Sequence, residues 1–144
     1  MKIIIREPNS AAELEQYYYL RWQLLRQPWQ QPRGSEQDEH ENIAKKVMAL
    51  DEAEIIGVGR IHQIAEQTWQ IRYMAVKEAY RGQKVGRKIL HKLETLAHEQ
   101  AASEIVLEAR AGAVEFYQKN GYRKLKPGKN LYAEIPHFWM QKKL

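Results

Sequence analysis

Residues 71–93 read IRYMAVKEAYRGQKVGRKILHKL, and this stretch predicts a strand, a basic turn and a helix. Residues 71–76 alternate along the chain and are rich in β-branched and aromatic side chains, as a strand requires. From Val85 onward the apolar residues fall four, four and three apart, which marks one face of a helix. The turn between them contains Gly82 and Gly86. A helix that starts after such a turn offers free backbone N–H groups and a positive dipole end, so we expect it to bind phosphate.

The charge of the turn supports that expectation. Between residues 81 and 92 there is no acid, and the cations are Arg81, Lys84, Arg87, Lys88 and Lys92. A pyrophosphate would suit such a site. The alternative is that Arg81 and Lys84 are solvated surface charges.

The composition is that of an ordinary globular protein, and residues 1–144 are expected to form a single domain. The absence of cysteine excludes disulfides, thiol nucleophiles and thiolate metal sites, and favours the cytoplasm. No apolar run approaches the roughly 20 residues of a membrane span, so we expect no membrane partner. The net charge of +5 suggests an anionic partner or simply keeps the protein in solution. Because the cations cluster at one turn, nucleic acid is not the partner we expect.

The rest of the chain predicts a mixed sheet with helices on both faces, α/β in the broad sense. Ser10 and Glu13 form a capping box that opens a helix, and this helix stops at Pro28. A turn is expected at Pro127-Gly128, and Pro136 is expected to make the last strand an edge or bulged strand. The other expected helices run from residue 85 to about 100 and from 111 to 120. Strands are expected at residues 2–6, 46–50, 54–63, 68–76, 104–108, 122–125 and 132–142.

The sequence lacks the residue patterns of several common catalytic and binding sites. None of the three serines lies in a G-x-S-x-G motif, which argues against a serine hydrolase. The five histidines are scattered without a ligand spacing, so we expect no metal. Residues 57–59 read GVG, but His62 stands where a dinucleotide fingerprint has its third glycine. These glycines are better explained by packing against a neighbouring strand. The basic turn also lacks the G-K-[ST] of a Walker loop.

A second stretch, AVEFYQKNGY at residues 113–122, follows the basic turn about thirty residues later. The two together resemble the GNAT superfamily of acyl-CoA-dependent N-acetyltransferases. The turn fits the family loop R/Q-x-x-G-x-G/A at Arg81 and Gly86, with Tyr80 in the usual lead-in, and departs from it at Lys84. The second stretch matches the family pattern A-x-x-F/L-Y-x-K-x-G-F/Y through Ala113, Phe116, Tyr117, Lys119, Gly121 and Tyr122.

The resemblance extends along nearly the whole chain, because the order of expected elements is also that of the family. It implies the GNAT fold, α/β (α+β), with a mixed and mostly antiparallel sheet of six to seven strands. There are two departures: Arg110 replaces a common asparagine, and Lys84 replaces a glycine. A lysine still supplies a backbone N–H and a cation, so we expect the loop to bind pyrophosphate, although a positive φ at Lys84 would be costly.

Acetyl-CoA is the acyl donor that the resemblance implies, with Tyr117 protonating the departing thiolate. A phenol is a credible acid for this step; the alternative for Tyr117 is an aromatic packed on the sheet beside Phe116. Ala113, Phe116 and Val85 are expected to pack rather than react. The residues implied in acetyl-CoA binding are Met74, Ala75, Val76, Arg81, Gly82, Gln83, Lys84, Val85, Gly86, Arg87, Ala113, Phe116 and Lys119.

The acceptor side stays open at this point. The acceptor is an amine of a small molecule or of a protein, and the base could be Glu108, His62, His137 or water. Arg21, Trp22 and the acidic loop at residues 36–41 are expected on the acceptor side, although that loop could also be a solvated surface. Other aromatic candidates for the pocket are Tyr17, Tyr18, Tyr19, Trp29 and Trp139. The alternative function is a non-catalytic CoA-binding module, and a homodimer is possible, as is common in the family.

Overall fold

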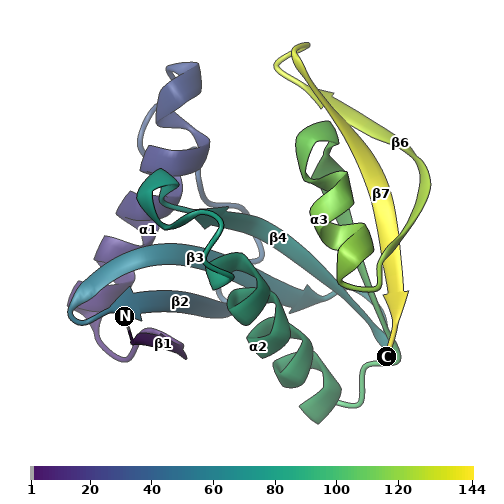
Figure 1. The fold of residues 1–144 in the computed structure, drawn as a ribbon, viewed down its shortest axis with the longest axis horizontal. Coiled ribbons are helices and arrows are strands. Elements are labelled where there is room, and N and C mark those ends of the chain that lie inside the picture. Colours follow the sequence, from purple (N-terminus) through teal and green to yellow (C-terminus); the bar gives the residue numbers. More distant parts are fainter. Residues whose placement is uncertain (1) are drawn as a thin grey trace.

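Seven strands form one sheet in the order β1-β2-β3-β4-β5-β7-β6 in the computed structural model, which describes residues 2–144 (Figure 1). The pair β4–β5 is parallel and every other neighbouring pair is antiparallel. The expected mixed, mostly antiparallel sheet is therefore confirmed. The strands are β1 (Ile3–Arg6), β2 (Lys45–Asp51), β3 (Glu54–Gln63), β4 (Thr68–Val76), β5 (Glu104–Arg110), β6 (Arg123–Leu131) and β7 (Ile135–Lys143).

Three α-helices and three 3₁₀ turns connect these strands. The helices are α1 (Ala11–Leu25), α2 (Val85–Glu99) and α3 (Val114–Lys119), and the 3₁₀ turns are η1 (Gln27–Trp29), η2 (Glu78–Tyr80) and η3 (Ala111–Ala113). Within residues 2–144 no helix is long and apolar enough to cross a membrane.

The first helix begins where the capping residues predict. The Ser10 hydroxyl accepts a hydrogen bond of 3.1 Å from the backbone N–H of Glu13. The Glu13 carboxylate accepts from the backbone N–H of Asn9 and from the guanidinium of Arg6. These bonds satisfy N–H groups that a helix start leaves free, and they join α1 to β1.

Helices cover both faces of the sheet because its central strands are apolar on both sides. In β2, Val47 and Ala49 belong to the core beneath α2, whereas Met48 and Leu50 pack with the side chains of α1. Figure 1 shows α2 and α3 on the near face and α1 behind the sheet. Each fully buried aliphatic side chain in these layers contributes about 1.5–3 kcal/mol.

The two glycines of β3 let α2 approach the sheet closely. A Cβ added at Gly57 would lie 2.8 Å from Ile89 Cδ1, and one at Gly59 would lie 2.7 Å from Ile89 Cγ2. Packing is thus the role of this Gly-Val-Gly segment, although the neighbour at closest range is a helix rather than a strand. It is not a dinucleotide-binding turn.

The final hairpin differs from the sequence-based expectation in two respects. Its turn lies at residues 132–134, where Tyr132 and Ala133 have φ values of 54° and 57°. Pro127-Gly128 instead lies inside β6, an edge strand that tolerates a residue without an N–H donor. The strand that contains Pro136 is not an edge strand, because β7 pairs with both β5 and β6. The β6–β7 pairing is bulged, but the extra residues lie on β6, between Lys124 and Lys126 and between Pro127 and Asn130, so the strand of Pro136 is not the bulged one.

Candidate active site

A bulge in β4 opens the sheet beside the basic turn. The pairing of β3 with β4 shifts between Val58 and Arg60, and Tyr73 opposite this point has a left-handed φ of 60°. The parallel pairing of β4 with β5 reaches only as far as Ile71 and Leu107. Beyond that pair the two strands separate, so residues 74–76 keep one edge of β4 free of β5.

The basic turn leads into α2 through two left-handed residues. Gly82 has a φ of 79°, and Lys84, the residue before the first helical turn, has a φ of 64°. Lys84 therefore adopts the backbone conformation that the family's glycine would adopt at little cost. A non-glycine residue there carries roughly 1–2 kcal/mol of strain. No side chain caps this helix start and its first turn contains no acid, so its N–H groups face outward with the positive dipole end.

A groove of about 810 Å³ runs from this turn along the free edge of β4 to α3, and we call it the large groove. Gly86 lies at its floor, where an added Cβ would lie 3.4 Å from the ring of Phe116. Gln83 is the residue of the expected set that does not line it, and its side chain donates to the Ala79 carbonyl oxygen. The expected residues that do line it are Met74, Ala75, Val76, Arg81, Gly82, Lys84, Val85, Gly86, Arg87, Ala113, Phe116 and Lys119, together with Tyr117.

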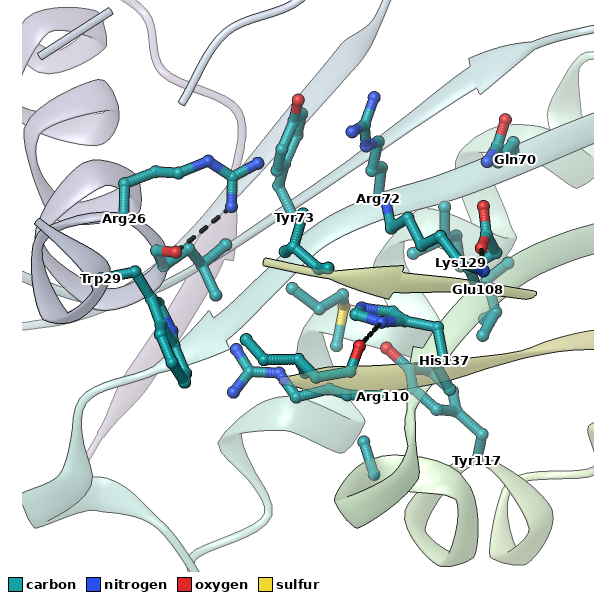
Figure 2. A pocket seen from close by; sticks show the side chains of 18 residues that line it. Arg26, Trp29, Gln70, Arg72, Tyr73, Glu108, Arg110, Tyr117, Lys129 and His137 are labelled. Atoms are coloured by element: carbon teal, nitrogen blue, oxygen red, sulfur yellow. Dashed lines mark hydrogen bonds between the residues drawn. The ribbon is translucent and has the colours of Figure 1, made fainter. Parts of the chain in front are cut away.

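A second hollow of about 250 Å³, which we call the small cavity, lies on the other side of the β4–β5 opening (Figure 2). Its walls come from β4, β5, the end of α1 with η1, the β6–β7 hairpin, and the η3–α3 segment that carries Ala113 and Tyr117. The large groove and the small cavity share five lining residues, which are Leu25, Met74, Arg110, Ala113 and Tyr117. A molecule in the groove and another in the cavity would therefore meet at Tyr117.

Tyr117 is held rigidly at this junction. Its ring packs edge-on against Phe116 and Tyr122, with centroid separations of 5.0 Å and 5.6 Å. The side chain is buried, and burial raises the pKa of its phenol well above the usual value, against a smaller opposing effect of Arg110. The phenol is therefore protonated at neutral pH and available as a proton donor.

Two of the three side chains considered as bases line the small cavity. Glu108 of β5 accepts a hydrogen bond of 2.9 Å from the backbone N–H of Lys129 through Oε2. His137 of β7 lines the same cavity as Tyr117 (Figure 2), and its Nδ1 lies 2.8 Å from the Ile135 carbonyl oxygen. Because a carbonyl oxygen only accepts, Nδ1 must carry the proton and Nε2 keeps its lone pair. Burial lowers the pKa of His137, so the ring is neutral at pH 7.

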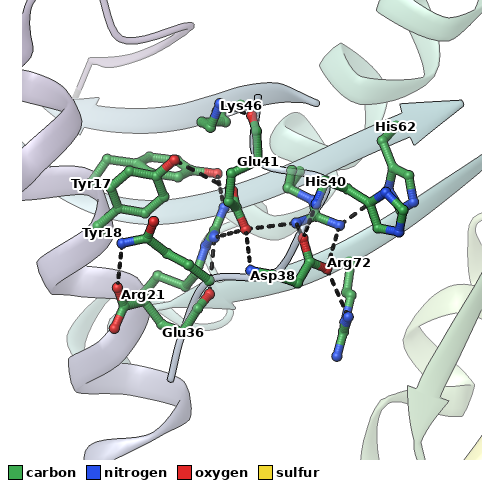
Figure 3. Close-up of polar contacts among 12 residues, drawn as sticks. Tyr17, Tyr18, Arg21, Glu36, Asp38, His40, Glu41, Lys46, His62 and Arg72 are labelled. Carbon is green, nitrogen blue, oxygen red and sulfur yellow. Dashed lines mark hydrogen bonds and ion pairs between the residues drawn. The ribbon is translucent and has the colours of Figure 1, made fainter. Parts of the chain in front are cut away.

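The third candidate, His62, lies elsewhere. Its ring stacks on His40 at a centroid distance of 4.5 Å, and its Nδ1 lies 3.1 Å from Arg60 Nη2 (Figure 3). It lines neither the groove nor the cavity. Burial and the charge of Arg60 lower the pKa of His62 to about 4, which reflects its place in a buried charge network.

The acidic loop is the other half of that network (Figure 3). Asp38 bonds to Arg60 at 2.6 Å and to Arg72 at 2.8 Å, and Glu41 bonds to Arg60 at 2.7 Å and to Arg21 at 2.9 Å. Asp38 and Glu41 thus neutralise arginines of α1, β3 and β4 inside the molecule. They are neither a solvated surface nor an acidic lip for a cationic acceptor.

The expected acceptor side also needs correction. Arg21 is fully buried in the network, and Trp22 donates from Nε1 to the Gln31 carbonyl oxygen. Neither lines the small cavity, and of the aromatic residues considered only Trp29 does. The contacts of Arg21, Trp22 and Trp29 depend on the path of residues 26–44 over the sheet. No local pattern in the sequence predicts that path.

Four cations of the small cavity were not predicted from the sequence as site residues: Arg26, Arg72, Arg110 and Lys129. They come from the end of α1, from β4, from β5 and from β6, and only the folded sheet brings them together. Of these four residues, only Arg110 stood out in the sequence, because many relatives have asparagine at this position.

Comparison with known proteins agrees with this geometry. Residues 25–144 match the family model of the acetyltransferase (GNAT) domain. The chain is 31% identical to the uncharacterized N-acetyltransferase YjcF of Bacillus subtilis (strain 168), over 99% of either chain. These matches favour an acetyltransferase over a non-catalytic CoA-binding module.

Solved structures share the fold. An aminoglycoside 6'-N-acetyltransferase complexed with coenzyme A superposes with a TM-score of 0.80 at 20% identity, covering 97% of this chain and 96% of that one. A GNAT family acetyltransferase from Elizabethkingia anophelis with acetyl-CoA bound gives 0.78 at 18% identity, covering 99% and 98%. The chain belongs to the GNAT family and is an acetyl-CoA-dependent N-acetyltransferase.

Proposed function

We propose that acetyl-CoA lies in the large groove and that the acceptor amine enters through the small cavity. The pyrophosphate would bind the backbone N–H groups at the start of α2, beside Arg81 and Lys84. The pantetheine arm would run along residues 74–76, the edge of β4 that β5 leaves free. This places the thioester where the groove and the cavity meet.

The reaction is a direct transfer. The neutral amine nitrogen attacks the thioester carbonyl, a C–N bond forms, and a backbone N–H of residues 74–76 stabilises the negative charge on the oxygen. The C–S bond then breaks, and Tyr117 gives its proton to the departing sulfur. The amine proton passes to Glu108 or His137, directly or through a water molecule, so protons and electrons balance.

The observation that carries this proposal is the position of Tyr117, a protonated phenol that lines both the groove and the cavity. An acid for the thiolate must contact the donor, and it must lie next to the attacking amine. Within residues 2–144 five residues line both spaces, and among them only Tyr117 has a side chain suited to give up a proton.

The experiment is to measure release of free CoA from acetyl-CoA in the presence of a panel of primary amines. A thiol reagent suits this assay because the chain contains no cysteine of its own. We expect amine-dependent thiol release and an acetylated product by mass spectrometry. Binding of acetyl-CoA without amine-dependent release across the panel would contradict the proposal and would favour a CoA-binding module.

A further inference from the structure

The small cavity carries an excess of positive charge. Its lining includes four cationic side chains, those of Arg26, Arg72, Arg110 and Lys129, and one carboxylate, that of Glu108. Figure 2 shows these side chains around one space. An acceptor that enters this space therefore meets a positive electrostatic potential, in addition to any interaction of its reacting nitrogen.

Only part of this charge is neutralised by the protein. Arg72 forms an ion pair of 2.8 Å with Asp38. Arg26 bonds through its guanidinium to the carbonyl oxygens of Ser35 and Leu25, at 3.1 Å and 3.2 Å. Carbonyl oxygens satisfy N–H donors but cancel no charge, so among residues 2–144 Arg26 has no carboxylate paired with it.

Lys129 is the second cation of the cavity that forms no ion pair within residues 2–144. Its backbone N–H, not its ammonium, bonds to Glu108, and no ion pair or hydrogen bond of the ammonium is found within the described residues 2–144. The side chain is half-buried, and burial lowers its pKa; repulsion from Arg72 and Arg26 adds to this effect, and the charge of Glu108 opposes it. Three cations therefore lie within electrostatic reach of one another. Arg110 is exposed and also lines the large groove, so it can serve the cofactor instead.

Grouping uncompensated cations in a partly desolvated cavity costs free energy that an anionic ligand would recover. A second cation on the ligand would raise that cost further. The volume of the cavity also limits the size of the acceptor, because about 250 Å³ lies below the range of about 300–1,000 Å³ that is usual for ligand pockets. Trp29, which lines the cavity, packs against Tyr132 of the hairpin with the two rings tilted and their centroids 5.8 Å apart.

We propose that the acceptor is a small primary amine that also carries a carboxylate or phosphate group, bound by Lys129 and Arg26. This inference rests on the proposed function and names its substrate class. It disfavours polyamines and lysine-rich protein segments, whose additional cations would face Lys129. The reacting amine points to the junction at Tyr117, and the anionic group lies deeper in the cavity.

Matched amines test the inference. Butylamine, 1,4-diaminobutane and 4-aminobutanoate have one chain length and similar basicity but differ in the group at the far end. We expect kcat/KM to be highest for 4-aminobutanoate, above butylamine by roughly ten- to a hundred-fold, the size of one charge-assisted hydrogen bond. Diaminobutane should be the poorest. Ethanolamine against O-phosphoethanolamine shows whether phosphate is preferred to carboxylate.

Lys129→Gln should lower the ratio of kcat/KM for 4-aminobutanoate to kcat/KM for butylamine, chiefly by raising the KM for 4-aminobutanoate. Lys126→Gln, on the same strand but outside both spaces, is the matched control. Equal or better turnover of butylamine or diaminobutane would overturn the inference and leave the proposed function standing. Failure of every amine to release thiol would overturn both.

Discussion

The carboxylate of Glu108 reaches across β7 to accept a hydrogen bond of 2.9 Å from the backbone N–H of Lys129. The bond ties the edge strand β6 to β5 and holds the carboxylate of Glu108, which lines the small cavity. It also requires Gly128, because a Cβ there would lie 2.5 Å from Glu108 Oε2. One contact thus shapes the cavity wall and positions a candidate base.

Replacing each candidate base by its neutral analogue should identify which one acts. Glu108→Gln keeps an acceptor for the Lys129 N–H, and His137→Asn keeps a donor for the Ile135 carbonyl oxygen. The variant that removes the base should lower kcat/KM by roughly a hundred-fold or more, and the other should change it far less. Equal activity of both variants and the wild type would indicate that water accepts the proton.

The pH dependence separates the same two groups. A base works when deprotonated, so kcat/KM rises as the pH passes through its pKa. Burial lowers the pKa of His137 below its usual value of 6.5, so a limb due to His137 should lie below pH 6.5. That limb should vanish in His137→Asn and persist in Glu108→Gln. A limb unchanged in both variants would exclude both as the titrating group.

Tyr117→Phe should lower kcat by roughly ten-fold or more and leave acetyl-CoA affinity nearly intact, because only the proton donor is lost. The ring keeps its contacts with Phe116 and Tyr122. Steady-state rates and calorimetric titration measure the two effects separately. An unchanged rate would remove Tyr117 from the proton transfer.

Asp38→Asn should destabilise the fold by about 3 kcal/mol, because it removes the ion pair of Arg72 and one of the two carboxylates that pair with the buried Arg60. Denaturant unfolding measures this loss. Glu39→Gln, in the same loop with its side chain 80% exposed, is the control and should change little. Equal stability of Asp38→Asn and the wild type would show that the network is not needed for the fold.

The stabilising effect of Asp38 should depend on pH with a definite sign. Burial alone would raise its pKa, but hydrogen bonds from Arg60 and from the His40 amide outweigh burial and hold the pKa well below 3.8. A depressed folded pKa stabilises the protein above the unfolded pKa of about 3.9, and this contribution is lost as the pH falls further. The difference between wild type and Asp38→Asn should therefore shrink below about pH 4. A difference constant down to pH 2 would contradict this assignment.

Lys84 allows its backbone and its charge to be tested apart. Lys84→Gly removes the strain of φ 64° and should leave stability unchanged or raise it by up to about 1 kcal/mol, whereas Lys84→Ala keeps the strain. Both remove the cation, so both should weaken acetyl-CoA binding by a similar few-fold factor. Weaker binding in Lys84→Gly alone would show that the constrained backbone, not the charge, matters.

Local patterns predict the part of the molecule that depends on neighbours in sequence. The strand at residues 68–76, the period of α2 and the capping pair Ser10 and Glu13 appear in the structure as expected. The alternation of residues 71–76 does not continue past the bulge at Tyr73, so Ile71 and Ala75 pack in different clusters. The residues around the basic turn also come together in one groove, because a strand, its turn and its helix carry most of them.

The small cavity could not be predicted in this way. Its walls come from five separate segments of the chain. Lys129 lines the cavity only because β6 pairs with β7 in the folded sheet. The Pro127-Gly128 pair suggests a turn in the sequence. In the structure the Glu108 carboxylate lies so close to Gly128 that a Cβ at this position would clash with it. In the sequence, Asp38 and Glu41 have the pattern of surface residues. In the structure they form ion pairs with the buried Arg60 and Arg21.

Calorimetric titration with acetyl-CoA tests the central claim most directly, that the turn before α2 holds the donor's pyrophosphate. Gly86→Glu places a negative charge at a helix start, which favours the helix but opposes the phosphate. Gly86→Ala is the control, since an added Cβ has ordinary contacts there. We predict saturable binding by the wild type and Gly86→Ala and its loss in Gly86→Glu, with circular dichroism unchanged. Absence of binding by the wild type, or equal binding by Gly86→Glu, would contradict the account.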